Sequence, residues 1–434
     1  MNEQVVQHPI FGKGVVQKTR YRGFELDVLF HDGISRWVRC DEIVAGQPAV
    51  PAVETASAYT AASEAQFVAR RRVEAFRLGI VPYDTVEAFT FGRGSEIYQM
   101  ERWLRNTYDP VFTLIGEYGS GKTHLLQYFE RDSLKEGYAV ATVTLEPNET
   151  PFSRPKRVYS ELIRTFRYRD PQSQQIQPFR TFLNVVLETG AFSDHFYFKH
   201  LINKMDNMEL LDWIEARSAS VRPLNNPSYR YIHPLYDNGV AANIYCYLLS
   251  AIGWAAKNIM NMPGLLLMFD EAETLWCGPS STRALSLNFL DALIRTANDE
   301  YLFTFPPQSG FIGLPEYSRY CGNVPFAYGT PSGLKLLFAL TPIENLIERF
   351  GKGFTEPLYL ENLSEGVLYG LVKKLCDVYA SAHGEPRTRF IDWDIYQRVM
   401  GANKSASSRL FVKACIEALD IDRLGRNAKR VRKI

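Results

Sequence analysis

Residues 116–126 read GEYGSGKTHLL, and this stretch decides how the rest of the sequence is interpreted. Three glycines fall within six residues and are followed at once by Lys122 and Thr123. Glycine inside a regular element costs about 0.5–1 kcal/mol relative to alanine, so the cluster indicates a place where bare backbone is needed. The stretch follows an apolar run and precedes a helical pattern, which is the setting of a P-loop. We therefore expect backbone N–H groups to surround a phosphate at the amino end of a helix.

The P-loop pattern assigns chemistry to its side chains. Lys122 is expected to reach the β- and γ-phosphates of a nucleotide, and the Thr123 hydroxyl is expected to bind Mg²⁺. ATP and Mg²⁺ are thus the predicted cofactors. The residues of this segment expected to contact the nucleotide are Gly116, Tyr118, Gly119, Ser120, Gly121, Lys122, Thr123 and His124.

A second motif, GLLLMFDEAETLW at residues 264–276, supplies acidic groups after a buried run. Asp270 is expected to hold Mg²⁺, through water, and Glu271 to polarise the attacking water. Strands often end in acidic turns, so the motif is weak alone and becomes strong beside a P-loop. Together the two motifs indicate hydrolysis of the nucleotide as well as its capture.

Three further positions follow from the chemistry of hydrolysis. Thr341 closes the run LKLLFALT. In P-loop ATPases of the kind that these two motifs indicate, a polar residue at this place orients the attacking water. A breaking γ-phosphate bond needs positive charge. Arg349 is expected to act as an arginine finger toward a neighbouring subunit, and Arg409 as a sensor on the C-terminal helices. The alternative for each arginine is a solvated surface position.

The predicted fold class is α/β, a three-layer domain with a parallel sheet. Near-continuous apolar runs suit strands covered on both faces, and helical segments between them imply crossover connections. The candidate strands are residues 111–116, 138–145, 264–270, 334–341 and 356–363.

The domain boundaries follow from changes in pattern along the chain. Residues 1–45 contain short β-rich runs and Asp-Gly turn signals, and they resemble small all-β SH3-like or Tudor-like barrels. Residues 46–63 are rich in Ala, Pro, Ser and Thr and are interpreted as a linker. The remainder is predicted to be a P-loop ATPase core at 64–363 with a helical insertion at about 148–262, a C-terminal helical lid at 364–424 and a basic tail at 425–434.

Several stretches together resemble one prokaryotic family. They are ARRRVEAFRLGIVP (69–82), FGRGSEIYQMERWL (91–104), the P-loop run, LEPNETPFSRPKRVYSELIRTF (145–166) and FDEAETL (269–275). They are similar to the P-loop ATP-binding proteins of bacteriophage-exclusion (BREX) defence systems, which look like AAA+ ATPases of the initiator and Cdc6-like branch. The resemblance covers about residues 65–420. It implies that Phe91, Gly92 and Arg93 lie near the adenine, and that the protein acts in antiphage defence beside a helicase or a methyltransferase.

Composition sets broad limits on the protein class. The 434 residues are 46% hydrophobic and 22% charged, with a formal net charge of +1, so two or three soluble folded units are expected. Six widely spaced cysteines form no CxxC motif, which favours buried free thiols in a reducing compartment. The N-terminus has no apolar signal core and no apolar run reaches the ~20 residues of a membrane span. We expect a cytoplasmic protein with no membrane partner.

DNA is an expected partner, directly or through another protein. The tail at 423–434 carries six basic residues and no acidic one, and RTFRYRD at 164–170 interleaves arginines with Phe166 and Tyr168. The β-rich module adds a balanced set of basic and acidic residues. The alternatives are a solubility tail, a solvated helix face and a protein-binding module.

The sequence favours a Mg²⁺-dependent, AAA+-like ATPase that forms a homo-oligomer and acts as a switch or motor on or near DNA. One alternative is an ATP-gated scaffold with little turnover that recruits a helicase or methyltransferase. A phosphotransferase is a second alternative, although no acceptor-site signature is present. An adaptor with a degenerate P-loop is disfavoured because Lys122, Thr123, Asp270 and Glu271 are all present.

Overall fold

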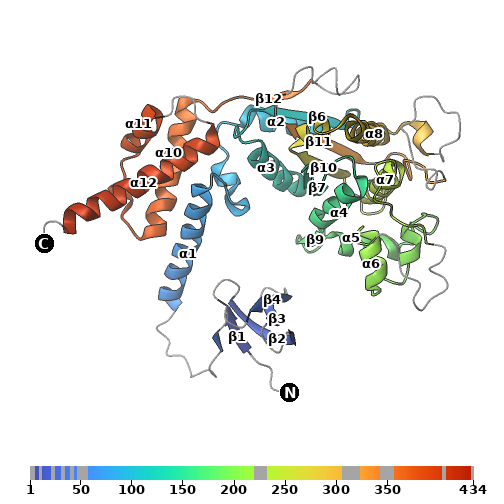
Figure 1. Cartoon of the computed structure of the whole chain (residues 1–434), viewed down its shortest axis with the longest axis horizontal. Coiled ribbons are helices and arrows are strands. Elements are labelled where there is room, and N and C mark those ends of the chain that lie inside the picture. The colour runs from blue at the N-terminus through green and yellow to red at the C-terminus, as the bar shows by residue number, and fades with distance from the viewer. Residues whose placement is uncertain are drawn as a thin grey trace. The chain divides into compact units, whose positions relative to one another are not determined.

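The computed structural model describes residues 5–8, 12–20, 25–30, 35–39, 44–45, 57–218, 232–304, 323–342, 356–402 and 407–431. The chain divides into two compact units, Met1–Ala65 and Gln66–Ile434, and each is described by itself (Figure 1).

The first unit contains a five-stranded antiparallel sheet. Its strands are β1 (Val5–His8), β2 (Gly12–Arg20), β3 (Glu25–Phe30), β4 (Ser35–Arg39) and β5 (Val44–Ala45), in the order β4-β3-β2-β1-β5. Alternate residues of β3, Leu26, Val28 and Phe30, are buried in the core of this unit. A Cβ on Gly14 would lie 2.4 Å from Val28 Cγ1, so β2 has a glycine where it crosses this core. The β-rich module is therefore present, and its closure into an SH3-like or Tudor-like barrel stays a prediction.

The second unit is built on a seven-stranded, mostly parallel sheet. Its parallel strands are β6 (Val111–Gly116), β7 (Ala139–Thr144), β10 (Leu265–Asp270), β11 (Leu334–Leu340) and β12 (Leu358–Leu360). The order is β12-β6-β11-β10-β7-β8-β9, which confirms the predicted α/β class and all five candidate strands. β11 lies between β6 and β10, so the carboxyl ends of these three strands are adjacent.

Helices cover both faces of this sheet and make three layers (Figure 1). On one face α2 (Gly94–Arg105) and α3 (Lys122–Lys135) share a core with Phe112, Leu114 and Leu266. On the other face α4 (Pro155–Thr165), α7 (Ala242–Asn258) and α8 (Ser280–Ala297) share a core with Val111, Ile115 and Leu267. Residues of one strand thus alternate between the two cores, as expected of a sheet buried on both sides.

The predicted helical insertion at 148–262 needs two corrections. β8 (Arg167–Arg169) and β9 (Ile176–Pro178) lie within it and extend the sheet with antiparallel pairs. α4 and α7 were also assigned to the insertion, but α4 packs on β7, and α7 is buried on nearly all sides against β10 and β11. The prediction missed this because an apolar helix that covers a sheet has the same sequence pattern as an apolar helix of a separate subdomain.

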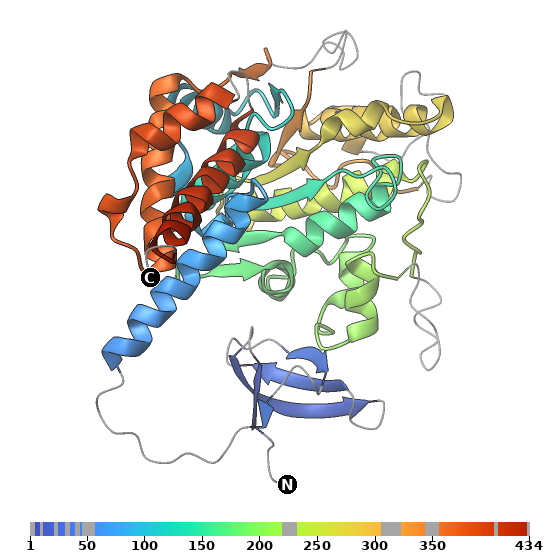
Figure 2. The same cartoon turned by 60° about the vertical axis from the view of Figure 1, so that its left-hand side comes forward.

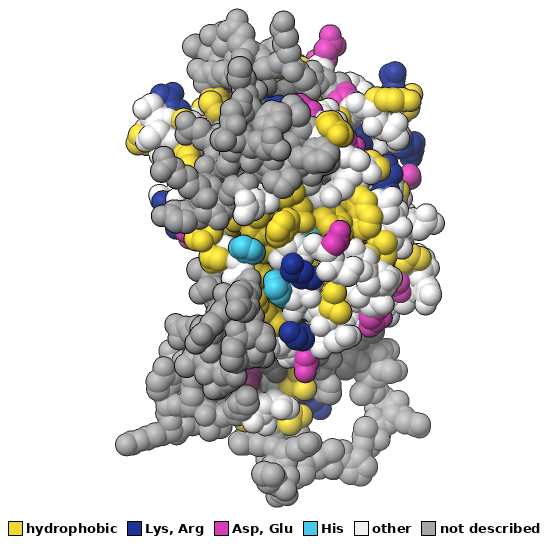
Figure 3. Space-filling model, turned by 90° about the vertical axis from the view of Figure 1, so that its right-hand side faces the viewer, with side chains coloured by type: hydrophobic (Ala, Val, Ile, Leu, Met, Phe, Trp, Pro, Cys, Tyr) yellow, Lys and Arg dark blue, Asp and Glu magenta, His cyan; other side chains and the backbone are white. Residues whose placement is uncertain are grey.

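The remaining part of the insertion is helical and aromatic. It comprises α5 (Phe179–Glu188), α6 (Met208–Ile214) and a 3₁₀ turn at Phe198–Leu201. His195 is completely buried, and its ring stacks on Tyr247 with centroids 4.5 Å apart. The aromatic packing extends to Phe196, whose ring contacts the exposed His233. Figure 3 views the side of this unit that carries α6, α7 and α8, where hydrophobic side chains form a band at the surface beside histidine side chains.

His195 is expected to make stability fall in mild acid. Its Nδ1 accepts the backbone N–H groups of Tyr197 and Phe198, both at 3.0 Å, and burial holds its pKa well below the usual value. The unfolded chain binds a proton at this histidine below about pH 6.5, and the folded chain does not. The contribution of His195 to the free energy of unfolding is therefore full above that pH. It is lost below it at about 1.4 kcal/mol per pH unit.

The measurement is the apparent melting temperature of the full chain between about pH 7.5 and 5.0, the range around the ordinary histidine pKa. In His195→Asn an amide oxygen can accept the same N–H groups without titrating, so its decline toward low pH should be shallower than that of the natural protein. The exposed His233→Asn is the control and should keep the natural slope. Equal slopes in all three proteins would contradict the assignment.

The C-terminal helices α10 (Glu365–His383), α11 (Asp392–Ala402) and α12 (Ser408–Val431) pack with α1 (Ser57–Arg77) in a separate core (Figure 2). Arg77 forms a two-contact ion pair with Asp420, and Arg70 donates to the Ala382 carbonyl at 2.8 Å. The arginine-rich helix near residue 70 is therefore fixed to the predicted lid region. Two boundaries are corrected: α1 begins at Ser57, inside the predicted linker 46–63, and α12 continues to Val431, past the predicted start of the tail at 425.

The described cysteines agree only partly with the expectation of buried free thiols. Cys246, Cys376 and Cys415 are buried free thiols, whereas Cys277 is an exposed one. Cys40 and Cys321 lie outside the described residues. None of the described helices combines the length and the apolar character that crossing a bilayer requires.

Candidate functional site

The P-loop connects β6 to α3 at the carboxyl edge of the parallel strands. Gly119 and Gly121 have φ values of +76° and +103°, a region that residues with a side chain rarely adopt. A Cβ on Gly116 would lie 2.5 Å from Ser120 Oγ, so the start of the loop has no room for one. α3 begins at Lys122, so the loop leads directly into the amino end of a helix with its unpaired N–H groups. The sequence therefore folds here into the backbone arrangement expected of a P-loop.

The two motifs meet at the ends of their elements. Thr123 Oγ1 donates a hydrogen bond to Asp270 Oδ2 at 2.7 Å, and the Glu271 N–H donates to Asp270 Oδ1 at 3.0 Å. The Lys122 ammonium is buried and donates to the Gly116 carbonyl at 2.8 Å. Asp270 is only 3% exposed, and burial raises the pKa of its carboxyl. A hydroxyl and a carboxylate are oxygen ligands that Mg²⁺ accepts together with phosphates and waters, so these residues fit the predicted ion.

Glu271 occupies an unusual backbone and electrostatic position. Its φ is +55°, and burial, followed by a hydrogen bond with Glu273, raises its pKa to about 7. Glu273 Oε2 also accepts the backbone N–H of Thr341 at 3.1 Å. A carboxyl group with a pKa near the working pH suits a general base. Glu273 thus links the expected base to the end of β11, where Thr341 was expected.

Glu273 was missed by the sequence analysis. Its only sequence signal is that it is the third acidic residue of FDEAE, two positions after Glu271. Acidic residues are common in the turn after a strand, so this signal had no specificity. The contact with Thr341 depends on β11 lying next to β10, and the order of the strands in the sheet cannot be read from the sequence.

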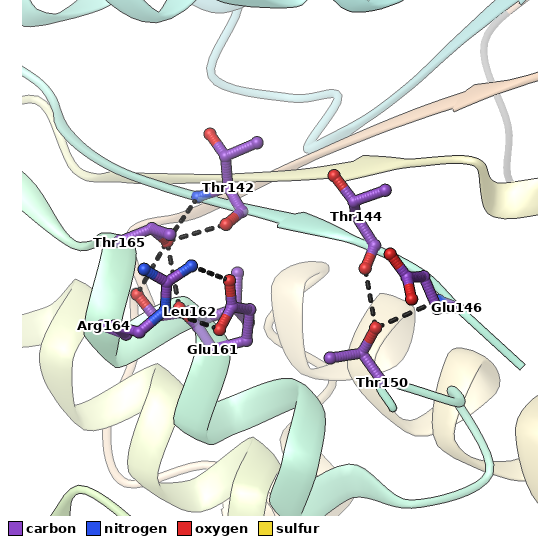
Figure 4. Close-up of polar contacts among 8 residues, drawn as sticks. All are labelled: Thr142, Thr144, Glu146, Thr150, Glu161, Leu162, Arg164 and Thr165. Carbon is purple, nitrogen blue, oxygen red and sulfur yellow. Dashed lines mark hydrogen bonds and ion pairs between the residues drawn. The ribbon is translucent and has the colours of Figure 1, made fainter. Parts of the chain in front are cut away.

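The Glu149-Thr150-Pro151 turn, specific to the family resemblance, lies close to the acidic motif. The Leu145 N–H donates to the Asp270 carbonyl at 3.0 Å, which joins the end of β7 to the end of β10. Thr150 Oγ1 then donates to the Thr144 carbonyl at 2.7 Å and accepts the Glu146 N–H at 3.0 Å (Figure 4). The threonine hydroxyl closes the turn, so its role in the structure is to hold this loop at the carboxyl edge of the parallel strands.

A cavity of about 380 Å³ adjoins the P-loop and is lined by residues 118–124, Glu271 and Arg409. Ligand pockets usually have about 300–1,000 Å³. Its apolar wall comes from the segment after α1, from α10 and from α12, and includes Ile80, Val81, Phe91, Leu363, Leu371 and Val412. A cavity with phosphate-binding backbone at one end and apolar side chains at the other fits a nucleotide.

The three residues expected near the adenine have different surroundings. Phe91 and Arg93 line the cavity, whereas Gly92 is not among its lining residues. A Cβ on Gly92 would lie 2.6 Å from Val367 Cγ2, so this glycine permits close packing on α10. Arg93 is buried and donates to the Ser120 carbonyl at 3.0 Å and to Glu96 Oε1 at 2.8 Å. Its guanidinium therefore positions the P-loop backbone, a role that the sequence did not indicate.

His124 holds the segment before α2 against α3. Its Nε2 lies 2.8 Å from Thr90 Oγ1, and its side chain lines the cavity. Burial and the nearby Arg93 lower its pKa to about 4. The ring is thus neutral at about pH 7, and any contact with a nucleotide would be as a neutral hydrogen-bonding group.

Arg409 lies beside the P-loop, as a sensor arginine would. Its backbone N–H donates to the Gly119 carbonyl at 3.3 Å, and its guanidinium donates to Tyr118 Oη at 3.0 Å. A Cβ on Gly79 would lie 2.5 Å from Arg409 Cγ, so the chain after α1 also packs closely against this residue. The catalytic role of Arg409 stays a prediction. Arg349 lies outside the described residues.

The residues predicted to contact nucleic acid differ in their exposure to solvent. Phe166 and Tyr168 are 2% and 1% exposed and belong to the core, so their predicted stacking on bases is wrong. Arg164 pairs with Glu161 on the surface of α4 (Figure 4). Arg167, Tyr168 and Arg169 form β8, which lies between β7 and β9, and the alternation of side chains along this strand places Tyr168 on its buried face. The backbone of the basic tail is helical up to Val431, and its side chains from Arg426 onward lie outside the description.

Residues 67–177 match the family described as BREX system ATP-binding protein BrxC/D. The matched range runs from α1 through β9 and includes the P-loop, whereas Asp270, Glu271 and Arg409 lie beyond it. No curated protein matches the chain. The similarity therefore supports the ATP-binding half of the site and the resemblance to BREX proteins.

Proposed function

We propose that this chain is a Mg²⁺-dependent ATPase of a bacteriophage-exclusion defence system. The observation that carries the proposal is the 2.7 Å contact between Thr123 of the P-loop and Asp270 of β10, with Glu271 next to it at the wall of the cavity. The similarity of residues 67–177 to BREX system ATP-binding proteins supports the biological setting.

The residues present divide the chemistry of hydrolysis among them. Lys122 and the loop N–H groups would bind the phosphates, and Thr123 and Asp270 would hold Mg²⁺, which when bound neutralises phosphate charge. Glu271 would accept a proton from the attacking water, and Thr341 would orient that water. The adenine would lie against the apolar wall that includes Phe91.

Positive charge for the departing phosphate would come from two arginines. Arg409 reaches the loop from α12 of the same chain. Arg349 would come from a neighbouring subunit, which makes a homo-oligomer part of the proposal. Binding of ATP would then order the subunits, and hydrolysis would release that order. The object of the switch is DNA or a DNA-bound helicase or methyltransferase, in keeping with the basic C-terminal tail.

A second candidate, an ATP-gated scaffold with slow turnover, is favoured by one observation. Burial and the neighbouring Glu273 raise the pKa of Glu271 to about 7, so part of this base is already protonated at neutral pH and cannot accept a proton from water. A base held in this way would hydrolyse ATP slowly until a partner or a neighbouring subunit rearranged the pair.

Phosphate release by the full chain, with and without duplex DNA, separates the two candidates. A motor or switch acting on DNA should release phosphate several-fold faster with DNA, because the partner completes the site. A scaffold should bind ATP and show the same slow release in both conditions. ATP binding with no phosphate release under either condition would contradict the ATPase proposal.

A further inference from the structure

A second cavity, of about 610 Å³, lies on the insertion between α4, α5 and the chain that follows α6. We call it the Lys156 groove. No residue lines both this groove and the nucleotide cavity. Its lining includes five basic residues, Lys156, Arg157, Arg164, Arg180 and Arg217. Three acidic residues also line it, Glu161, Glu215 and Asp237, so the lining carries five positive and three negative charges, a net of +2.

The acidic residues are all engaged by arginines. Arg164 pairs with Glu161, and Arg157 lies 3.3 Å from Asp237. Arg180 and Arg217 share Glu215, at 2.9 and 3.1 Å from its Oε2. The carboxylates therefore orient the guanidinium groups around the groove and leave its excess positive charge in place.

Lys156 is the side chain that these pairs leave without a partner. It is only 9% exposed and forms no hydrogen bond or ion pair with another described residue. It lies in the first turn of α4, where the unpaired N–H groups of the helix already carry partial positive charge. Burial lowers its pKa, and the charge of Asp237 opposes that shift. Burial, the absence of an ion-pair partner and the positive end of the helix each disfavour a charged ammonium here. A bound anion would offset all three effects.

We propose that the Lys156 groove binds a terminal phosphate group, carried by a free nucleotide or by the 5′ end of a nucleic acid strand. A phosphomonoester carries about −1.5 to −2 charge at pH 7, which matches the net charge of the lining. Guanidinium groups already oriented by carboxylates suit phosphate oxygens. The volume suits a small ligand or a chain end, and a terminal group can approach the buried Lys156 more closely than an internal phosphodiester of a duplex.

The test uses the full chain carrying Lys122→Ala, so that the P-loop does not contribute to binding and the result stands whether or not the ATPase proposal holds. Calorimetry would measure AMP, a 5′-phosphorylated single-stranded oligodeoxynucleotide and the same oligonucleotide with a 5′-hydroxyl. We expect the 5′-phosphate to tighten oligonucleotide binding at least tenfold, or AMP to bind by itself. AMP binding identifies a free nucleotide as a source, and binding of the phosphorylated strand alone identifies a strand end.

Substitutions then locate the binding. Lys156→Met should raise the Kd of the phosphorylated ligand at least tenfold, whereas Lys156→Arg should keep it within about threefold because the charge remains. The exposed Lys199→Met, on the same insertion, should leave the Kd unchanged. Lys156→Met should also melt at a higher temperature without ligand, because a buried charge is removed. Absence of phosphate-dependent binding in the parent, or an unchanged Kd in Lys156→Met, would overturn the proposal.

Discussion

Glu271→Gln is expected to reduce ATP turnover by about a factor of 10²–10⁴ while ATP remains bound. Glutamine has the size of glutamate but accepts no proton from water at neutral pH. Its amide can still donate to the neighbouring Glu273, so the turn after β10 should be kept. The variant should therefore hold ATP and retain whatever assembly ATP induces.

The measurement combines phosphate release with nucleotide content and particle mass. The natural protein should release phosphate and lose its ATP-dependent assembly over time, whereas the variant should keep both ATP and assembly. Glu188→Gln, on α5 and away from the cavity, is the matched control and should behave like the natural protein. Normal turnover in Glu271→Gln would show that the catalytic assignment is wrong.

Lys122→Ala is expected to weaken ATP binding at least about a hundredfold. A hydrogen bond to a charged group contributes about 1.5–3 kcal/mol, and Lys122 is expected to contact two phosphates. The ammonium also donates to the Gly116 carbonyl, so the loop loses an internal contact as well. Both losses act on the same binding step.

Affinity would be measured with a fluorescent ATP analogue, and circular dichroism would show that the fold persists. Lys135→Ala, at the other end of α3, is the control because its ammonium is half-exposed and pairs with Glu87 far from the loop. The control should bind as tightly as the natural protein. Similar affinities for Lys122→Ala and Lys135→Ala would place the nucleotide elsewhere.

The sequence predicted those parts of the fold that depend on local pattern. The five parallel strands are continuous apolar runs, and the central ones are buried on both faces in the structure. The P-loop was predictable because Gly119 and Gly121 need positive φ. Thr123 and Asp270 could be predicted to lie together because both were expected to bind the same Mg²⁺, and the structure brings them into contact.

Features that depend on tertiary packing were not predictable in this way. α7 reads like any apolar helix, and its place against the sheet follows from neighbours distant in the chain. Phe166 and Tyr168 alternate with arginines as a nucleic-acid surface would, but Phe166 ends α4 in the core and Tyr168 lies on the buried face of β8. The roles of Glu273 and Arg93 required knowledge of which strands and loops are adjacent.

The central claim is that the P-loop and the acidic end of β10 together bind the triphosphate of ATP. Calorimetric titration of the purified full chain with ATP and Mg²⁺ tests it most directly. The account predicts saturable heat from a site that the Lys122→Ala variant lacks, and weaker binding at this site when Mg²⁺ is removed by a chelator. A titration with no heat of binding, in a protein shown to be folded, would contradict it.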